Sequence, residues 1–143
     1  MKFFVAAFAG GVAVLASASA SAQTGNWYGT VSAPVIRQTN TDYNSGNINP
    51  QAQPSGTVIT STSWYATYSG APAGMSFKIT HCRTSGSICA PLSGFNSGST
   101  NFHAGVGSLQ PFFFRVRVNS TSTQVLSSSM VSTPLQLTVN YSY

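Results

Sequence analysis

Apolar and polar side chains alternate at every second position in several stretches of this chain. The pattern is clearest at 75–80, 112–118 and 135–142. A period of two indicates β-strands that bury one side and expose the other. The stretch 57–68 is rich in β-branched and aromatic residues, which predicts a further long strand. The chain is therefore expected to be built from strands.

Shorter strands are expected between these long ones. Their positions are 31–35, 88–92, 101–104 and 124–130. Segments rich in Gly, Pro, Ser and Asn separate the strands, and turns are predicted at 70–74, 93–99 and 119–123, with a long loop at 40–54. Seven or eight short strands joined in this way predict an all-β fold. We expect a small antiparallel β-sandwich, or a partly open barrel.

The first 22 residues have the features of a secretory signal peptide. Lys2 supplies a positive charge, an apolar stretch follows, and Ala20-Ser21-Ala22 fits the cleavage pattern of small residues. Cleavage after Ala22 makes Gln23 the first mature residue, and cleavage after Ala20 is the close alternative. An uncleaved membrane anchor is a weaker interpretation, because the apolar stretch is shorter than the roughly 20 residues that span a bilayer. Residues 23–143 are then expected to form a single exported β-sandwich domain with no membrane span after cleavage.

The chain has two cysteines, Cys82 and Cys89, separated by a turn-forming Ser-Gly-Ser sequence. In an exported protein this spacing predicts a disulfide between the two strands of a hairpin. A metal site with His81 and His103 is the alternative, but these residues supply few ligands at suitable spacing. A redox-active pair is a further alternative, although the C-x-x-C spacing of catalytic dithiols is absent.

The composition excludes several classes of function. Only 5% of the residues are charged, the formal charge is +5, and Asp42 is the single acidic residue. One carboxylate cannot form the paired acids of a typical glycosidase or an all-oxygen Ca²⁺ or Mg²⁺ cage. The chain lacks a nucleophile elbow and a Gly-rich phosphate loop, and no local context singles out a serine for a triad with Asp42. We expect no catalytic residues, no metal and no cofactor.

One predicted strand face combines cations with an aromatic ring. Phe113, Arg115 and Arg117 share the side of the 112–118 strand opposite its apolar side, and they form a candidate interaction face for an anionic partner. Trp64 and Tyr65 are further candidates, as a platform for a sugar. The plainer alternatives are a solvated sheet face and a buried tryptophan. Five basic residues spread over the mature chain are too few for a nucleic-acid footprint, so no nucleic-acid partner is expected.

Several short motifs follow one another in a characteristic order. They are Gly25-Asn26-Trp27, Ser63-Trp64-Tyr65, Pro72-Ala73-Gly74-Met75, the two cysteines, Leu109-Gln110-Pro111-Phe112-Phe113-Phe114, and a C-terminal strand ending in Val139-Asn140-Tyr141. In the order of these motifs the chain resembles the FlhE family of small exported flagellar proteins, over roughly 63–143 and with Gly25-Asn26-Trp27 as an additional N-terminal match. The segment 40–54 looks longer than in the family, and acidic residues are nearly gone, which weakens any inference of a shared binding surface.

The resemblance implies a non-enzymatic periplasmic protein linked to flagellar export and assembly. Members of the family are thought to limit proton leakage through the export machinery or to chaperone flagellar parts. The leading hypothesis is therefore an accessory protein that contacts flagellar rod or export-apparatus proteins through strand edges or the Arg115 and Arg117 face.

Two other functions fit parts of the sequence. The first alternative is a pilus or surface-fibre subunit assembled by donor-strand exchange, in which Trp27 to Val35 serves as the donor strand. The second is a cell-wall carbohydrate binder that uses Trp64 and Tyr65. Neither the partner, the oligomeric state nor the role of the 40–54 segment follows from the residues.

Overall fold

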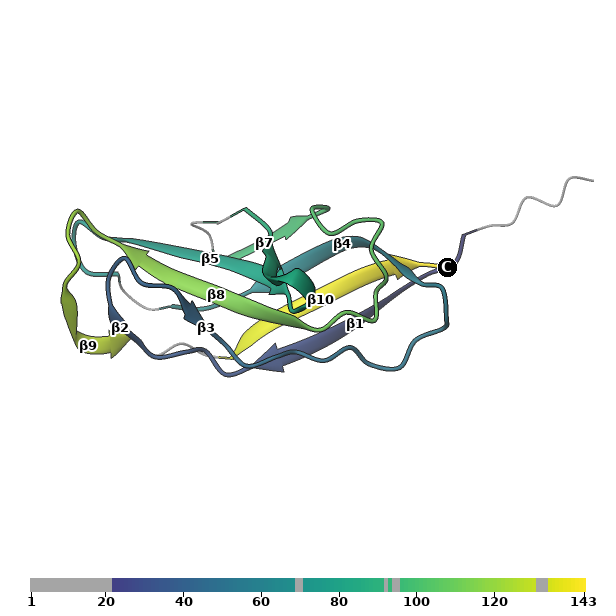
Figure 1. Ribbon diagram of the computed structural model, residues 1–143, viewed down its shortest axis with the longest axis horizontal. Helices are drawn as coiled ribbons and strands as arrows, with labels where there is room; N and C mark the ends of the chain where they lie inside the picture. The colour runs from purple at the N-terminus through teal and green to yellow at the C-terminus, as the bar shows by residue number, and fades with distance from the viewer. Residues whose placement is uncertain (1–21, 69–70, 92, 94–95, 131–133) are drawn as a thin grey trace, which may run out of the picture.

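The computed structural model describes residues 22–68, 71–91, 93, 96–130 and 134–143, so the predicted signal peptide lies outside the described residues except for Ala22. The described part is built from β-strands and one short 3-10 turn (Figure 1). In chain order they are β1 (Thr24–Val31), β2 (Ile36–Gln38), β3 (Tyr43–Asn44), β4 (Val58–Tyr65), β5 (Ser76–Arg83), η1 (Ser85–Ser87), β6 (Ile88–Cys89), β7 (Ser97–Thr100), β8 (Phe112–Asn119), β9 (Val125–Met130) and β10 (Leu135–Ser142). No helix in these residues is long and apolar enough to cross a membrane.

Two four-stranded sheets lie face to face and form an elongated sandwich (Figure 1). The first, which we call the β10 sheet, has the strand order β1-β10-β4-β7, and the second, the β8 sheet, has the order β3-β8-β5-β6. Strands β2 and β9 pair separately, and every strand pair is antiparallel. The expected all-β antiparallel sandwich is confirmed. The described residues contain ten strands, because several two- to four-residue strands have too little alternation to be recognised in the sequence.

The core lies between the two sheets and follows the alternation of the long strands. On β10, Leu135, Leu137 and Val139 are fully buried, and the residues between them are exposed or half-buried. On β8, Phe112, Phe114, Val116 and Val118 face the core in the same way. Each such side chain contributes roughly 1.5–3 kcal/mol when it is removed from water. The alternation of apolar side chains thus determines which side of each sheet faces the core.

Trp27 fixes the edge strand β1 to this core. The side chain is 2% exposed, its indole Nε1 donates a hydrogen bond to the carbonyl oxygen of Ser108 over 3.2 Å, and its ring lies 6.2 Å from that of Phe112. A buried tryptophan with a satisfied N–H is the ordinary role expected for this residue type in a sandwich. Trp27 is therefore a structural residue.

Strand β1 pairs with β10 of the same chain over its full length, from Thr24 opposite Ser142 to Val31 opposite Leu135. Backbone bonds between Gln23 and Tyr143, of 3.1 and 3.0 Å, extend this ladder by one residue. The residues expected to act as a donor strand thus complete a sheet within their own chain. The fibre-subunit alternative is for this reason not carried further.

The prediction of a strand at 31–35 is wrong. Strand β1 ends at Val31 and β2 begins at Ile36, with Pro34 between them. Proline has no N–H to donate to a ladder, so it interrupts an alternating pattern that otherwise resembles a strand. The alternating pattern at 31–35 therefore covers the last residue of β1 and the connection to β2.

The strand expected at 101–104 is also wrong, because these residues form a turn. The Ala104 amide donates to the carbonyl oxygen of Asn101 over 2.8 Å, and Gly105 follows with φ of +80°. The strand lies just before, at β7, where a turn had been expected over 93–99. Strand β7 is made of Ser, Gly and Thr, which are typical turn residues, and it forms because it pairs with β4.

The segment 40–54, expected to be a long loop, contributes to the β8 sheet. Tyr43 and Asn44 pair with β8 as strand β3, and Ile48 forms a bridge with Phe112. Ile48 is buried. The segment therefore covers one edge of the sheet and supplies a core side chain.

The disulfide between Cys82 and Cys89 is confirmed, with the two residues opposite each other on β5 and β6. In the described residues the predicted 88–92 strand is shortened to the two residues of β6, and Leu92 lies outside the described residues. Ala90 and Pro91 follow β6 directly, and Pro91 has no N–H for a ladder.

Replacing both cysteines with alanine is expected to lower the free energy of unfolding by about 2 kcal/mol, because the disulfide restricts the unfolded chain around a short loop. Urea unfolding followed by circular dichroism measures this loss. The double variant of two exposed residues, Ser85→Ala and Ser87→Ala, is the matched control and should change stability little. Equal stability of the oxidised wild type and the cysteine-free variant would contradict the expectation.

Candidate functional site

A β-bulge in β4 determines which of its side chains face the core. Ser61 pairs with Asn140 and Ile59 pairs with Tyr141, so Thr60 is the extra residue between two consecutive partners on β10. A bulge shifts the alternation by one residue. Beyond it, Thr62 and Trp64 face inward.

These two side chains meet two buried histidines between the sheets. The Thr62 hydroxyl lies 2.7 Å from Nε2 of His81, and the Trp64 ring lies 5.5 Å from the His81 ring. The His103 ring packs edge-on against His81, with centroids 5.2 Å apart. Each histidine is 1% exposed. We call Thr62, Trp64, His81 and His103 the histidine cluster.

Burial keeps both histidines of the cluster neutral. Burial, together with the smaller effect of the charge that His103 can carry, lowers the pKa of His81 to about 3. Burial also lowers the pKa of His103, the backbone at His81 opposes this shift, and the Arg83 cation adds to it. Neither ring nitrogen of His103 has a hydrogen bond of normal geometry in the described residues.

The cluster does not supply the parts of a hydrolytic or metal site. A hydroxyl next to an imidazole is the start of a catalytic triad, but Asp42 lies at the surface, paired with Arg117 over 3.6 Å. The cysteines are bonded to each other, and the described residues hold no group of three His, Cys, Asp or Glu side chains suited to a metal. The histidine cluster is therefore interpreted as a group of packed side chains beside which a ligand can bind.

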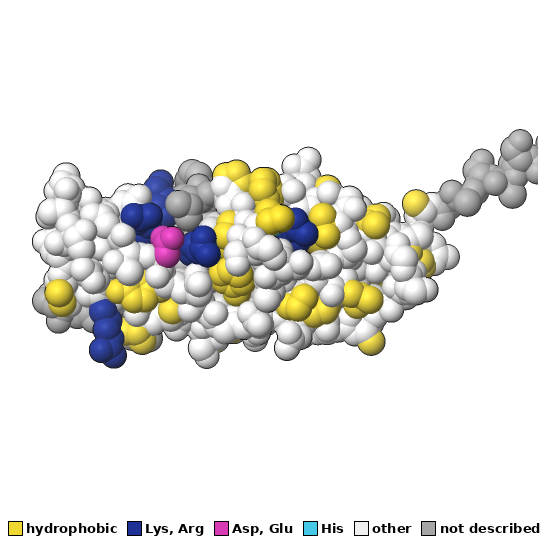
Figure 2. Space-filling model, in the orientation of Figure 1, with side chains coloured by type: hydrophobic (Ala, Val, Ile, Leu, Met, Phe, Trp, Pro, Cys, Tyr) yellow, Lys and Arg dark blue, Asp and Glu magenta, His cyan; other side chains and the backbone are white. Residues whose placement is uncertain are grey.

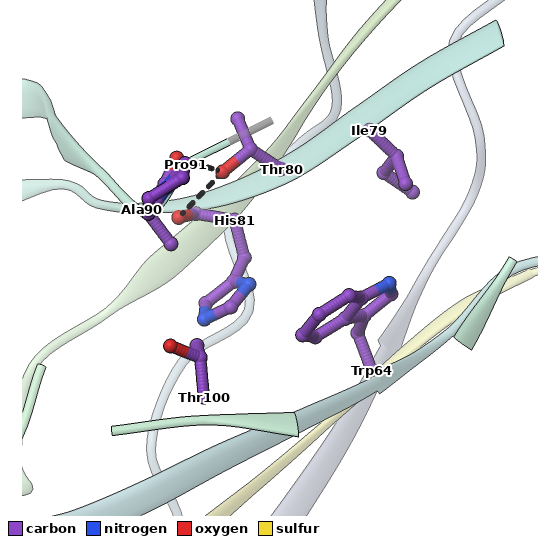
Figure 3. A pocket seen from close by; sticks show the side chains of 7 residues that line it. All are labelled: Trp64, Ile79, Thr80, His81, Ala90, Pro91 and Thr100. Atoms are coloured by element: carbon purple, nitrogen blue, oxygen red, sulfur yellow. Dashed lines mark hydrogen bonds between the residues drawn. The ribbon is translucent and has the colours of Figure 1, made fainter. Parts of the chain in front are cut away.

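A cavity of about 160 Å³ opens beside the cluster, between the edges of the two sheets. Figure 3 shows the Trp64 and His81 rings facing it from opposite sheets, with Thr100 of β7 beside them and Ala90 and Pro91 above. The Thr80 hydroxyl, also in the lining, donates to the Ala90 carbonyl oxygen over 2.5 Å. The lining is mostly apolar and contains no charged side chain among the described residues. Such a cavity suits an apolar group.

A second candidate site lies on the outer face of the β8 sheet. Lys78 pairs directly with Arg117, and Thr80 pairs with Arg115 on the next outward position. We call Lys78, Arg115 and Arg117 the basic stripe. Figure 2 shows Lys and Arg side chains gathered around the single acidic side chain on one face of the molecule.

Neighbouring residues hold the two arginines of the stripe in place. Arg117 pairs with Asp42 and donates to the carbonyl oxygen of Asn40 over 2.9 Å. Arg115 donates to the Asn44 side chain over 3.2 Å and lies 5.7 Å above the Phe113 ring. One acid cannot neutralise three cations, so the stripe keeps a positive potential.

The structure separates the residues that the sequence grouped as one interaction face. Phe113 lies on the same face as the basic stripe, but it is buried opposite Cys82. Trp64 and Tyr65 are consecutive on β4, so Trp64 faces the cavity while Tyr65, 51% exposed, lies on the other side of the β10 sheet. They cannot share a sugar platform, and the carbohydrate alternative is not carried further.

Sequence reasoning missed Lys78 as a member of the stripe. The alternation at 75–80 places Lys78 on a polar face, but only the pairing of β5 with β8 brings it opposite Arg117.

The comparisons with known proteins identify the family. Residues 34–142 match the family described as Flagellar protein FlhE. The chain belongs to the FlhE family. The match begins well before the 63–143 region of the sequence resemblance, so it includes the 40–54 segment. No curated protein matched the chain.

A solved FlhE structure has the same fold as this FlhE-family chain. It is described as "Crystal Structure of FLHE", is 24% identical, and superimposes with a TM-score of 0.68 over 82% of this chain and 96% of the other. At this identity the likeness supports the sandwich fold alone.

Proposed function

We propose that this FlhE-family protein is a periplasmic accessory protein of flagellar export or assembly, which acts by protein–protein contact and limits leakage or misassembly. The family match over most of the chain is the observation that carries the proposal. The described residues offer binding surfaces and no assembled catalytic group, which favours contact over chemistry.

Two features support a periplasmic location. The first is the N-terminal segment with its Ala20-Ser21-Ala22 cleavage pattern. The second is the Cys82–Cys89 disulfide, since disulfides persist in the oxidising periplasm and are rare in the cytosol.

The basic stripe is the surface that we assign to the partner. Three cations face outward from adjacent strands, and cross-strand cations such as Lys78 and Arg117 repel each other in the free protein. An acidic surface on a flagellar rod or export-apparatus protein relieves that repulsion and accelerates the encounter. Bound to that acidic surface, the rigid sandwich acts as a steric plug or as a chaperone.

Complementation of a gene deletion tests the proposal. The deletion strain is expected to swim less well or to leak protons into the cytoplasm, and the wild-type gene should restore it. The double variant Lys78→Glu with Arg115→Glu should restore it poorly, because the stripe then repels an acidic partner. Arg37→Glu reverses an exposed cation on β2, outside the stripe, and should restore function fully.

Two outcomes count against parts of the proposal. Normal swimming and normal proton retention in the deletion strain would contradict the flagellar role. Full complementation by the stripe variant would remove the stripe from the mechanism. The thermal unfolding midpoints of the purified variants show whether a failure to complement comes from lost folding.

A further inference from the structure

Strand β7 is the edge strand of the β10 sheet at the end opposite β1. The Ala66 amide donates to the carbonyl oxygen of Asn96 over 2.6 Å, which fixes the phase of the antiparallel ladder. Gly98 and Thr100 therefore exchange backbone bonds with β4, and the backbone groups of Ser97 and Ser99 point toward the open edge. Strand edges are commonly protected by lysine, proline or bulges, and the Ser-Gly-Ser-Thr sequence of β7 has neither lysine nor proline.

The inner side of this edge leads directly into the cavity. A Cβ atom on Gly98 would lie 2.5 Å from the Trp64 ring, so the indole occupies the space that a side chain at Gly98 would fill. Thr100 of the same strand lines the cavity with Trp64 and His81 (Figure 3). Edge and cavity therefore form one continuous surface.

We propose that this surface binds an extended, uncharged peptide segment of a partner protein, which adds to β7 as a further strand and places one apolar side chain in the cavity. The proposal rests on the proposed function, because it adds a second contact, at the β7 edge, to the contact that the basic stripe makes with a partner protein. Strand addition combines backbone hydrogen bonds with a side-chain pocket, and this surface offers both.

The geometry of the β-ladder determines which residue of the peptide places its side chain in the cavity. The peptide exchanges backbone hydrogen bonds with Ser97 and Ser99. Its residue opposite Gly98 then lies between two bonded positions and points to the inner side of the sheet, next to the Trp64 ring. Residues on either side point outward to solvent.

The cavity sets the size and polarity of that side chain. Its volume of about 160 Å³ is similar to the roughly 150 Å³ cavity that holds benzene in a protein core. Leucine, isoleucine and phenylalanine have suitable size and polarity. An aspartate there is disfavoured, because it loses its hydration without gaining a cationic partner in the lining.

Three synthetic peptides test the proposal on the oxidised, folded protein. Their sequence is acetyl-Thr-Ser-Thr-Xaa-Thr-Ser-Thr-amide, with leucine, alanine or aspartate at Xaa. At millimolar concentration the leucine peptide should slow amide hydrogen exchange at Ser97 and Ser99 and change Trp64 fluorescence. The alanine and aspartate peptides should bind more weakly than the leucine peptide by a factor of roughly ten or more, since they lose the burial of a leucine side chain.

Two variants separate the edge from the cavity. Ser99→Pro removes a backbone N–H that points to the open edge and leaves the backbone ladder to β4 in place, although it also removes the hydroxyl that bonds to Ser63 and to the Thr62 carbonyl oxygen. Ala90→Leu fills the cavity. Both should weaken binding of the leucine peptide at least tenfold. Ala52→Leu, the same enlargement at an exposed loop position, should not weaken it. Thermal unfolding midpoints close to wild type establish that the variants are folded.

Absence of binding by the leucine peptide would overturn the inference, as would equal binding to wild type, Ser99→Pro and Ala90→Leu. If the deletion strain nevertheless shows its motility or leakage defect, strand addition fails and the proposed function stands. If the peptides bind and the deletion strain is normal, the binding site stands and the flagellar role fails.

Discussion

Replacing Trp27 with alanine is expected to lower the free energy of unfolding by about 3–5 kcal/mol, the cost of removing a large aromatic side chain from a packed core. The substitution leaves a cavity between the sheets next to Phe112 and deprives the carbonyl oxygen of Ser108 of its buried donor. It also loosens the edge strand β1. Urea denaturation monitored by circular dichroism measures the loss.

Tyr28→Ala is the matched control, because Tyr28 is the next residue on β1 and is 63% exposed. Its effect should be below about 1 kcal/mol, as for most surface substitutions. Similar losses for the two variants would contradict the assignment of Trp27 to the core and Tyr28 to the surface.

Acidification is expected to destabilise the protein through the histidine cluster. The pKa of His81 is about 3 in the folded state and 6.5 in the unfolded chain, so the unfolded state binds more protons between these values. Stability is therefore full above pH 6.5 and falls as the pH drops from 6.5 toward 3. His81 alone lowers it by about 1.4 kcal/mol per pH unit in this window.

Two measurements check this expectation. The NMR signals of the His81 ring should stay those of the neutral imidazole down to about pH 4 in the folded protein. The variant His81→Leu should have a shallower dependence of its unfolding free energy on pH, even if its stability at pH 7 differs. A normal histidine titration near pH 6.5, or an unchanged slope in the variant, would contradict the buried neutral state.

Much of the fold could be predicted from side-chain order alone. Strands β8 and β10 have long runs of strict alternation, and each run buries one side as expected. The disulfide could be predicted equally well, because two cysteines seven residues apart around a Ser-Gly-Ser turn leave few other pairings in an exported chain. Both features depend on residues close together in the sequence, so the sequence pattern is enough to predict them.

Features that depend on pairing between distant segments could not be predicted. The bulge at Thr60 reverses the inward side of β4, so Trp64 faces the cavity and Tyr65 does not. A short strand is expected at 101–104, whereas the structure has a turn there, in which His103 packs against His81. Strand β7 exists because β4 pairs with it. Each of these outcomes depends on register, which residue order alone does not specify.

Site-specific photocross-linking in living flagellated cells tests the central claim, a contact between this FlhE-family protein and the flagellar apparatus, most directly. A photoreactive residue at position 115 in the basic stripe should yield adducts with a flagellar rod or export-apparatus protein, and one at position 37 should yield few or none. Adducts from position 115 that contain no flagellar protein, or equal yields from both positions, would contradict the account.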